Sequence, residues 1–492
     1  MKIAISYPPL ESNKGIPLLA QNRQFQWFKV PTYIYPMIPA YAATMLRMEG
    51  YRIIWDDGIA EEKTYKQWLK DIERKNPDII VIETKTPVIK RHWRIINEVK
   101  EILPDTKIVL VGDHVSALPE ESFHFSKVDY VLTGGDYDFL LVNLVKYLNG
   151  EVRQLEPGIY YREDNKVRST GKFQLNHDLN QLPFIDRDLT KWWLYAYKNG
   201  NFKRTPGTYT MVGRDCWWRK GGGCTFCSWT ILYPSFRVRK PELLVEEIEI
   251  LVEKYKMKEV FDDTGTFPIG SWLRRFCKLM IEHGLNEKIY FSCNMRFGAL
   301  TKEDYMLMKK AGFRMLLFGL ESANQKTLDK LNKGITVQDI IRECKWASEV
   351  GLEPHITIMV GYPWETREDI LRTFLLAKKL FEKGWATTLQ ATIVIPYPGT
   401  KLYQEALENG WFRINPQDYE KYDMKEPVLK TPDMEPEEIM EMCDSMYKLF
   451  LTPKYMIIHL KRIKMYEDIK WTIKGVLKVL GHIKDFMPKR KK

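Results

Sequence analysis

The first 150 residues alternate short apolar runs with segments of helical periodicity, and this alternation restricts the fold more than any other feature of the chain. Apolar runs bounded by helical segments are typical of strands buried on both faces of a parallel sheet. The sequence therefore predicts a doubly wound, Rossmann-like α/β domain. Its expected strands are Lys2–Tyr7, Arg52–Asp56, Asp78–Glu83, Lys107–Val111 and Asp129–Leu132, and its expected helices are Ala40–Glu49, Tyr65–Lys75, Ile89–Ile102 and Asp138–Leu148.

Length and hydrophobicity set the scale of the protein. A chain of 492 residues, 45% of them hydrophobic, is long enough for two or three domains with separate cores. No apolar run reaches the roughly 18 residues that a membrane span needs, and no signal peptide is recognisable. We therefore expect a cytoplasmic protein.

Polar and small residues gather where the predicted strands end. Doubly wound sheets bind ligands at the carboxyl ends of their strands, so these residues are the candidate ligand contacts. No G-x-G-x-x-G follows the first strand and no G-x-x-x-x-G-K-[ST] occurs, which argues against a dinucleotide or a P-loop nucleotide. The candidate positions are Glu83, Thr84, Gly112, His114, Ser116, Thr133 and Gly134.

Three of the seven cysteines, Cys216, Cys224 and Cys227, fall within the segment RDCWWRKGGGCTFCSWT. Clustered thiolates are soft ligands that suit iron–sulfur clusters or zinc. Three ligands are one fewer than a closed structural site needs, and they would leave one iron of a [4Fe–4S] cluster open to a substrate or cofactor. The triplet therefore predicts a reactive metal site.

Two other interpretations of the cysteines stay open at this point. A structural zinc site would need a fourth ligand, but His177 and His283 are far from the triplet in sequence. A disulfide framework would need an oxidising compartment and an even number of cysteines. The other four cysteines stand singly in apolar surroundings and are expected to be buried thiols. They are Cys277, Cys293, Cys344 and Cys443.

Two N-terminal segments, YPMIPAYAATMLRMEGY at 35–51 and GDHVSALPEES at 112–122, resemble the cobalamin-binding domain of cobalamin-dependent radical S-adenosylmethionine enzymes. The cysteine triplet resembles the radical motif of the same family, and the resemblance covers roughly residues 1–480. It implies three cofactors: a [4Fe–4S] cluster on Cys216, Cys224 and Cys227, S-adenosylmethionine, and cobalamin bound by the strand-end residues above.

The chain departs from the family pattern in two places. Seven residues separate Cys216 from Cys224, where the family usually has three, and Gly221, Gly222 and Gly223 lie in the longer loop. Glycines would let the backbone pass close to the metal. The D-x-H-x-x-G signature is also absent after the first strand. The resemblance therefore implies no histidine on cobalt, and His114 is expected to hydrogen-bond to the cofactor rim or to loop backbone.

Strand ends downstream of the cysteines match further family motifs. The resemblance implies that Asp262, Asp263 and Thr264 bind the methionine amino group, although a helix cap or Asx turn would also explain them. It places Arg296 near the methionine carboxylate, Glu321 and Ser322 at the ribose, and the turn beginning at Gly361 beside the adenine. A partial (β/α)6 barrel is implied, with strands at Glu259–Asp262, Tyr290–Asn294, Met315–Phe318, His355–Val360 and Leu389–Ile395.

The expected organisation is a cobalamin-binding domain at 1–150, a connector at 151–202, the barrel at 203–410 and a helical region at 411–492 with a basic tail. The resemblance implies methyl transfer from cobalamin to an unactivated carbon, supported by an external electron donor. The preferred substrate is a protein or peptide side chain, with a glutamine of methyl-coenzyme M reductase as the candidate. Non-methylating cyclisation or rearrangement of a lipid or small molecule is the alternative, and a metal-and-corrinoid carrier is disfavoured.

The positive charge is concentrated at the C-terminus. Residues 454–492 hold twelve Lys or Arg and three acids, so they carry +9 of the net +11. Ile469, Ile473, Val476, Leu480 and Ile483 recur at helical spacing, which predicts a basic amphipathic helix. The helix either packs on the barrel with a solvated lysine face or contacts an acidic protein partner or an anionic membrane surface. No motif supports nucleic-acid binding.

Overall fold

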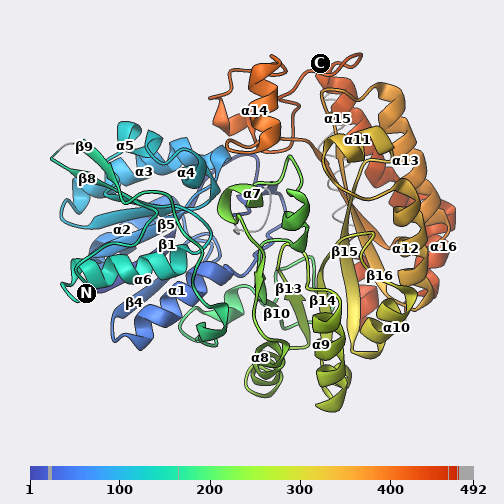
Figure 1. The fold of residues 1–492 in the computed structure, drawn as a ribbon, viewed down its shortest axis with the longest axis horizontal. Coiled ribbons are helices and arrows are strands. Elements are labelled where there is room, and N and C mark those ends of the chain that lie inside the picture. Colours follow the sequence, from blue (N-terminus) through green and yellow to red (C-terminus); the bar gives the residue numbers. More distant parts are fainter. Residues whose placement is uncertain (20–24, 165, 464, 474, 476–492) are drawn as a thin grey trace.

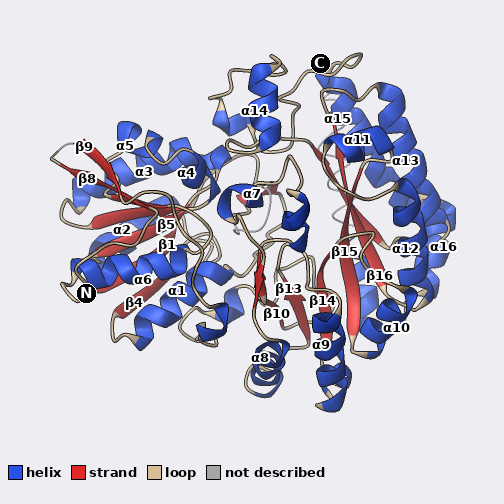
Figure 2. Ribbon diagram, in the orientation of Figure 1, coloured by secondary structure: helices blue, strands red, loops and turns tan. Residues whose placement is uncertain are grey.

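The computed structural model describes residues 1–19, 25–164, 166–463, 465–473 and 475. Two α/β domains lie side by side, the N-terminal domain at the left of Figure 1 and the barrel at its centre and right. In both domains helices flank the sheet (Figure 2). The mixed α/β architecture predicted from the sequence is confirmed.

The N-terminal sheet contains all five predicted parallel strands, and its order is β4-β1-β5-β6-β7-β8-β9. The helices α1 and α6 pack together on one face of the sheet, and α2 and α3 pack on the other. The parallel strands are β1 (Lys2–Tyr7), β4 (Arg52–Asp57), β5 (Ile79–Glu83), β6 (Lys107–Val111) and β7 (Tyr130–Leu132), and the helices are α1 (Met37–Met48), α2 (Tyr65–Lys75), α3 (Ile89–Ile102) and α6 (Tyr137–Leu148).

The expected connector at 151–202 is partly wrong, because its first part belongs to the N-terminal sheet. A hairpin of β8 (Ile159–Glu163) and β9 (Lys166–Ser169) pairs antiparallel with β7. The N-terminal domain therefore extends past residue 150. Shorter elements in this half are the paired β2 (Ile16–Pro17) and β3 (Trp27–Phe28), and the helices α4 (Asp113–Ala117) and α5 (Glu121–Phe125).

The second sheet has six parallel strands in sequential order, β10-β13-β14-β15-β16-β17, as expected of a partial barrel. The strand β10 precedes the five that the sequence predicts. The strands are β10 (Gly207–Thr210), β13 (Glu259–Asp262), β14 (Tyr290–Met295), β15 (Phe313–Glu321), β16 (Glu353–Val360) and β17 (Thr388–Ile393). The helices that follow them are α8 (Pro241–Glu253), α9 (Ser271–Glu282), α10 (Lys302–Lys310), α11 (Gln325–Lys330), α12 (Val337–Glu349) and α13 (Arg367–Glu382).

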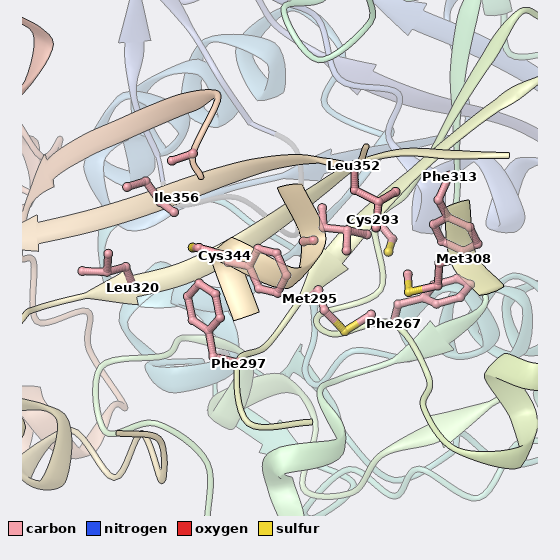
Figure 3. Close-up of a cluster of buried hydrophobic side chains, with 14 of the residues drawn as sticks. Phe267, Cys293, Met295, Phe297, Met308, Phe313, Leu320, Cys344, Leu352 and Ile356 are labelled. Carbon is pink, nitrogen blue, oxygen red and sulfur yellow. The ribbon is translucent and has the colours of Figure 1, made fainter. Parts of the chain in front are cut away.

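The barrel core lies between the sheet and its outer helices, and it explains two of the isolated cysteines. Cys293 and Cys344 lie among side chains such as Phe267 and Met308 (Figure 3). Cys277 and Cys443 belong to the same core. All four are buried, so the prediction of ordinary core thiols is confirmed.

The region after the barrel is helical and packs against it. The helix α14 (Lys401–Glu408) ends within the expected barrel range, and the region after residue 410 contains α15 (Pro436–Ser445) and α16 (Pro453–Lys461). The helix α15 contacts β16 and β17, and α16 contacts α13. Val476, Leu480 and Ile483 of the predicted amphipathic repeat lie outside the described residues. Within the described ranges, no helix combines the length and the apolarity that a membrane span requires.

Candidate functional site at the cysteine loop

The three clustered cysteines lie on a loop between β11 (Gly213–Arg214) and α7 (Trp229–Leu232). Burial raises the pKa of Cys216 and Cys227, to about 12 for Cys227, and the neighbouring charge of Cys224 raises both further. Cys216 Sγ also lies 2.9 Å from Thr266 Oγ1. In the described ranges no three Cys, His, Asp or Glu side chains are already disposed around one ion.

The additional residues between Cys216 and Cys224 fold into a closed turn. Arg219 donates two hydrogen bonds to the Asp215 carboxylate, at 2.6 and 2.7 Å. Asn332 donates to the carbonyls of Gly221 and Gly223 at 2.7 and 2.8 Å, which fixes the far end of the turn. Hydrogen bonds therefore hold both ends of the segment between Cys216 and Cys224 in a compact turn.

Buried donors without a protein partner surround this loop. Arg296 is 5% exposed, its guanidinium lies 4.1 Å from the ring centroid of Trp218, and its Nη2 has no partner. Trp217 Nε1, Thr225 Oγ1 and Tyr362 Oη are also buried without a partner. A buried donor left unpaired costs about 1–3 kcal/mol. Unpaired donors beside three thiols fit the binding of an anionic group. An iron–sulfur cluster with a carboxylate ligand would be such a group.

The three residues expected at the methionine amino group already have roles in the fold. Asp262 accepts hydrogen bonds from Thr210 Oγ1 at 2.9 Å, from the backbone of Val212 at 3.0 Å and from that of Thr264 at 3.1 Å. Thr264 Oγ1 accepts from the backbone of Gly213 at 2.8 Å. Asp262 and Thr264 thus brace the strand that leads to Cys216. Asp263 lies beside Asn294, 3.4 Å from its amide nitrogen.

Glu321 forms a buried ion pair with Lys333, a residue that the sequence did not indicate as part of the site. Lys333 Nζ lies 2.7 Å from Glu321 Oε1. Burial lowers the pKa of Lys333, but the charges of Glu321 and Cys224 outweigh it and raise that pKa. A Cβ at Gly319 would lie 2.2 Å from Glu321 Oε1. Glu321 also has a φ of 62°, a strained geometry that is concentrated at functional sites.

Ser322 and the turn after Gly361 are joined through Glu365. Ser322 Oγ donates to Glu365 Oε1 at 2.6 Å, and Thr327 Oγ1 donates to the same oxygen at 2.8 Å. Burial raises the pKa of Glu365 to about 7. Gly361 has a φ of 87°, and a Cβ there would lie 3.2 Å from Ile439. The structure therefore brings Ser322 and the turn together.

The candidate residues at the end of the N-terminal sheet form one connected edge. Ser116 Oγ donates to the carbonyl of Gly112 at 2.7 Å and accepts from the backbone of Gly134 at 3.0 Å. Thr133 Oγ1 donates to the carbonyl of Gly158 at 2.8 Å. A Cβ at Gly112 would lie 2.3 Å from the carbonyl oxygen of Thr84, so only glycine fits there.

Glu83 and His114 are both held by neighbouring side chains. Glu83 Oε2 accepts a hydrogen bond from Tyr7 Oη at 2.5 Å, while its Oε1 has no partner. Glu83 and Tyr137 both line a cavity of about 10 Å³. Burial raises the pKa of Glu83 to about 7. The two ring nitrogens of His114 lie 3.2 Å from Thr86 Oγ1 and 3.1 Å from Glu121 Oε2. Both partners are side chains, whereas a contact with the cofactor rim or with loop backbone was expected.

A buried network of charges ties the N-terminal domain to the cysteine loop. Arg214, two residues before Cys216, contacts Asp138 at 2.6 Å and the carbonyl of Gly135 at 2.9 Å. Arg237 on β12 (Arg237–Val238) contacts Asp136 at 2.6 and 2.8 Å. A Cβ at Gly135 would lie 1.8 Å from the Tyr233 ring. We call this contact the domain seam, and it fixes the strand ends of one domain against the cysteine loop of the other.

Comparison with known proteins agrees with this geometry. The B12 binding domain model matches residues 28–139, and the Radical SAM superfamily model matches residues 211–377. An uncharacterized methyltransferase of Pyrococcus horikoshii is 30% identical over 97% of this chain and 98% of its own length. The chain belongs to the cobalamin-dependent radical S-adenosylmethionine enzymes. Its cofactors are a [4Fe–4S] cluster, S-adenosylmethionine and cobalamin.

Other relatives place the enzyme among the methyltransferases of this family. The bacteriochlorophyllide d C-8(2)-methyltransferase of Chlorobaculum tepidum is 31% identical over 73% of this chain and 74% of its own length. Radical S-adenosylmethionine methyltransferase TsrM of Kitasatospora setae shares the fold, with a TM-score of 0.63 and 14% identity over 84% of this chain and 76% of its own. The enzyme is a radical S-adenosylmethionine C-methyltransferase.

The solved structure of OxsB, a cobalamin-dependent radical enzyme, extends the likeness across both domains. It has a TM-score of 0.69 and 16% identity, and the match covers 98% of this chain and 71% of that one. At this identity the likeness concerns the fold alone.

Proposed function

We propose that this methyltransferase modifies an unactivated carbon of a protein side chain, with a glutamine of methyl-coenzyme M reductase as the candidate substrate. The observation that carries the proposal is the polarity of the inner barrel face. On β16, Ile356 and Ile358 belong to the core beneath the outer helices, whereas Thr357 does not. Side chains alternate between the faces of a strand, so His355 and Thr357 face inward.

The neighbouring strands repeat this arrangement. On β17, Leu389 and Ala391 enter the outer core, so Gln390 faces inward, where its amide donates to Gln26 Oε1 at 3.0 Å. On β14, Cys293 points outward, Asn294 faces inward, and the buried Ser292 Oγ has no partner. Thr357, Gln390 and Asn294 already have protein partners, whereas Ser292 Oγ would stay unpaired beside a buried acyl chain. A primary amide has both donors and an acceptor with which this hydroxyl could pair.

We assign roles to the chain's residues on the same basis. Cys216, Cys224 and Cys227 would hold the cluster, while Arg296 and Trp217 would bind a carboxylate at its open iron. When bound, the cofactors supply a radical that removes hydrogen and a methyl group that replaces it. In balanced form, R–H, two S-adenosylmethionine and two electrons from an external donor give R–CH3, S-adenosylhomocysteine, 5′-deoxyadenosine and methionine. The seam would keep the two cofactor sites at a fixed separation.

The decisive experiment is an anaerobic assay with methyl-deuterated S-adenosylmethionine and a glutamine-containing peptide of methyl-coenzyme M reductase. We expect a peptide heavier by one labelled methyl group, with S-adenosylhomocysteine and 5′-deoxyadenosine formed in equal amounts. The matched control is the same peptide with glutamate in place of the glutamine. Equal methylation of both peptides would contradict recognition of the amide.

A non-methylating reaction is the second candidate, because one relative is a cyclase. The anaerobic magnesium-protoporphyrin IX monomethyl ester cyclase of Rubrivivax gelatinosus is 26% identical over 85% of this chain and 74% of its own length. Such a reaction would form 5′-deoxyadenosine without S-adenosylhomocysteine during productive turnover. Observation of these by-products would contradict methyl transfer and support the non-methylating reaction.

Glu321→Ala is expected to weaken binding of S-adenosylmethionine by about 10- to 150-fold. The reason is the loss of the charge-assisted hydrogen bonds that the ribose hydroxyls would donate to Glu321, which contribute about 1.5–3 kcal/mol. Isothermal titration of the reconstituted enzyme measures the effect. Asp329→Ala, at an exposed carboxylate on α11, is the control. Unchanged affinity in Glu321→Ala would show that Glu321 serves only to pair with Lys333.

A further inference from the structure

Exposed apolar side chains are concentrated in the C-terminal helical region. Of the 21 large hydrophobic residues that are exposed in the described ranges, eight lie between residues 451 and 473. Isolated exposed apolar residues are normal on a protein surface, but a contiguous group marks an interaction site. The group consists of Leu451, Met456, Ile457, Leu460, Met465, Tyr466, Ile469 and Ile473.

The inner faces of these helical segments are already committed to the barrel. Tyr455 donates to the carbonyl of Thr387 at 2.9 Å, and Asp468 forms an ion pair with Arg204 at 3.1 Å. Trp471 Nε1 donates to the carbonyl of Gly200 at 3.3 Å. On each segment the opposite face is therefore directed to solvent. Leu460 of α16 is 61% exposed, and Tyr466 of the following segment is 65% exposed.

Lysines flank this outward face. Lys454 has a side chain that is 73% exposed, and Lys461 and Lys470 are also exposed. Glu467 is partly exposed, and Glu382 of α13 lies 3.7 Å from Lys454 Nζ. The sequence that follows, 476–492, adds six Lys or Arg and one Asp. We call Met456, Ile457, Leu460, Tyr466, Ile469 and Ile473 with the three lysines the C-terminal face.

We propose that the C-terminal face docks the enzyme on an anionic lipid surface. Apolar side chains bordered by lysines are the pattern of helices that lie in a membrane interface, and the lysines are attracted to anionic headgroups. A second copy of the chain would oppose one strongly positive region with another. A lipid surface meets both requirements together, because its anionic headgroups attract the lysines and its acyl boundary accepts the six apolar side chains.

The position of the face is compatible with catalysis. The helix α16 lies at the outer edge of the barrel domain, on the side away from the N-terminal domain (Figure 1). The cysteine loop and the domain seam lie between the two domains. Attachment through α16 therefore leaves the cofactor sites and the barrel interior uncovered.

Vesicle flotation of the full-length reconstituted enzyme tests this proposal. Vesicles of phosphatidylcholine with phosphatidylglycerol should carry at least about ten times more enzyme than vesicles of phosphatidylcholine alone, and added salt should reduce the difference. Ile457→Glu with Leu460→Glu should abolish flotation. Met48→Glu, at a residue of α1 that is 72% exposed, should leave it unchanged. All variants should cleave S-adenosylmethionine at the parental rate.

Three outcomes would overturn the proposal. The first is equal flotation with neutral and anionic vesicles, and the second is retained flotation of the Ile457→Glu, Leu460→Glu variant. The third is a dimer, seen by light scattering without flotation, that the same variant dissociates; the face would then join two copies. Failure of flotation with normal peptide methylation would leave the proposed function intact.

Discussion

Replacing Cys216, Cys224 or Cys227 by alanine is expected to remove the [4Fe–4S] cluster and reduce cleavage of S-adenosylmethionine to the level of the apoprotein. A cluster with an open iron has only three protein thiolates, so each loss leaves a second iron without its ligand. Iron content and cluster absorbance after anaerobic reconstitution measure the first effect. Release of 5′-deoxyadenosine measures the second.

Cys344→Ala is the control for this series, because Cys344 is buried in the barrel core. Its loss leaves a small cavity and lowers stability, but the variant should keep its iron. A triplet variant that retains full iron and activity would remove that cysteine from the site. Loss of iron in Cys344→Ala, with the fold intact by circular dichroism, would mean that the core cysteine takes part.

Arg214→Met is expected to destabilise the folded enzyme by about 3–5 kcal/mol, because the change leaves the buried carboxylate of Asp138 without its partner. The midpoint of urea unfolding and the rate of proteolysis at the domain seam measure the effect. Arg74→Ala serves as the control. Arg74 has a side chain that is 78% exposed and pairs with Asp71 on the surface, where a pair contributes at most about 1 kcal/mol.

A second change separates burial of an unpaired charge from loss of packing. Arg214→Met combined with Asp138→Leu removes both charges, and such replacements of buried pairs are often neutral or stabilising. We therefore expect the double variant to recover most of the lost stability. A double variant as unstable as Arg214→Met would contradict the electrostatic explanation and indicate that the hydrogen bond to Gly135 dominates.

The strands and helices could be predicted because each leaves a local pattern. The runs Lys2–Tyr7 and Lys107–Val111 are buried on both faces and have the predicted limits. The hairpin of β8 and β9 was missed because its half-exposed strands follow a polar segment and resemble a connector. The N-terminal candidates followed from their place at predicted strand ends, whereas the roles of the barrel residues followed from the family resemblance. The cofactor contacts of both groups remain predictions.

The contacts that organise the site join residues far apart in the chain. Arg214 and Asp138 are separated by 76 positions, and no local periodicity relates them. Lys333 lies just after α11 and is followed by Gly334, which has a φ of 60°. In the sequence, a lysine before a glycine indicates the end of a helix and not an ion pair with Glu321. The shape of the inserted turn after Cys216 depends likewise on the contact between Arg219 and Asp215, which the sequence does not indicate.

The domain seam separates two properties of the enzyme that evolution can change independently. The close approach of the two domains depends on Gly135, because a methyl group added there would lie 1.8 Å from the Tyr233 ring. Arg214 also donates to the carbonyl of Gly135 across the seam. Thr357, which faces the barrel interior, belongs to β16, which is separated from β10 by three other strands of the sheet. Substitutions at distant, unconnected sites have nearly additive effects. Under the proposed function, new acceptors could therefore be accommodated at β16 while the contacts of the domain seam are kept.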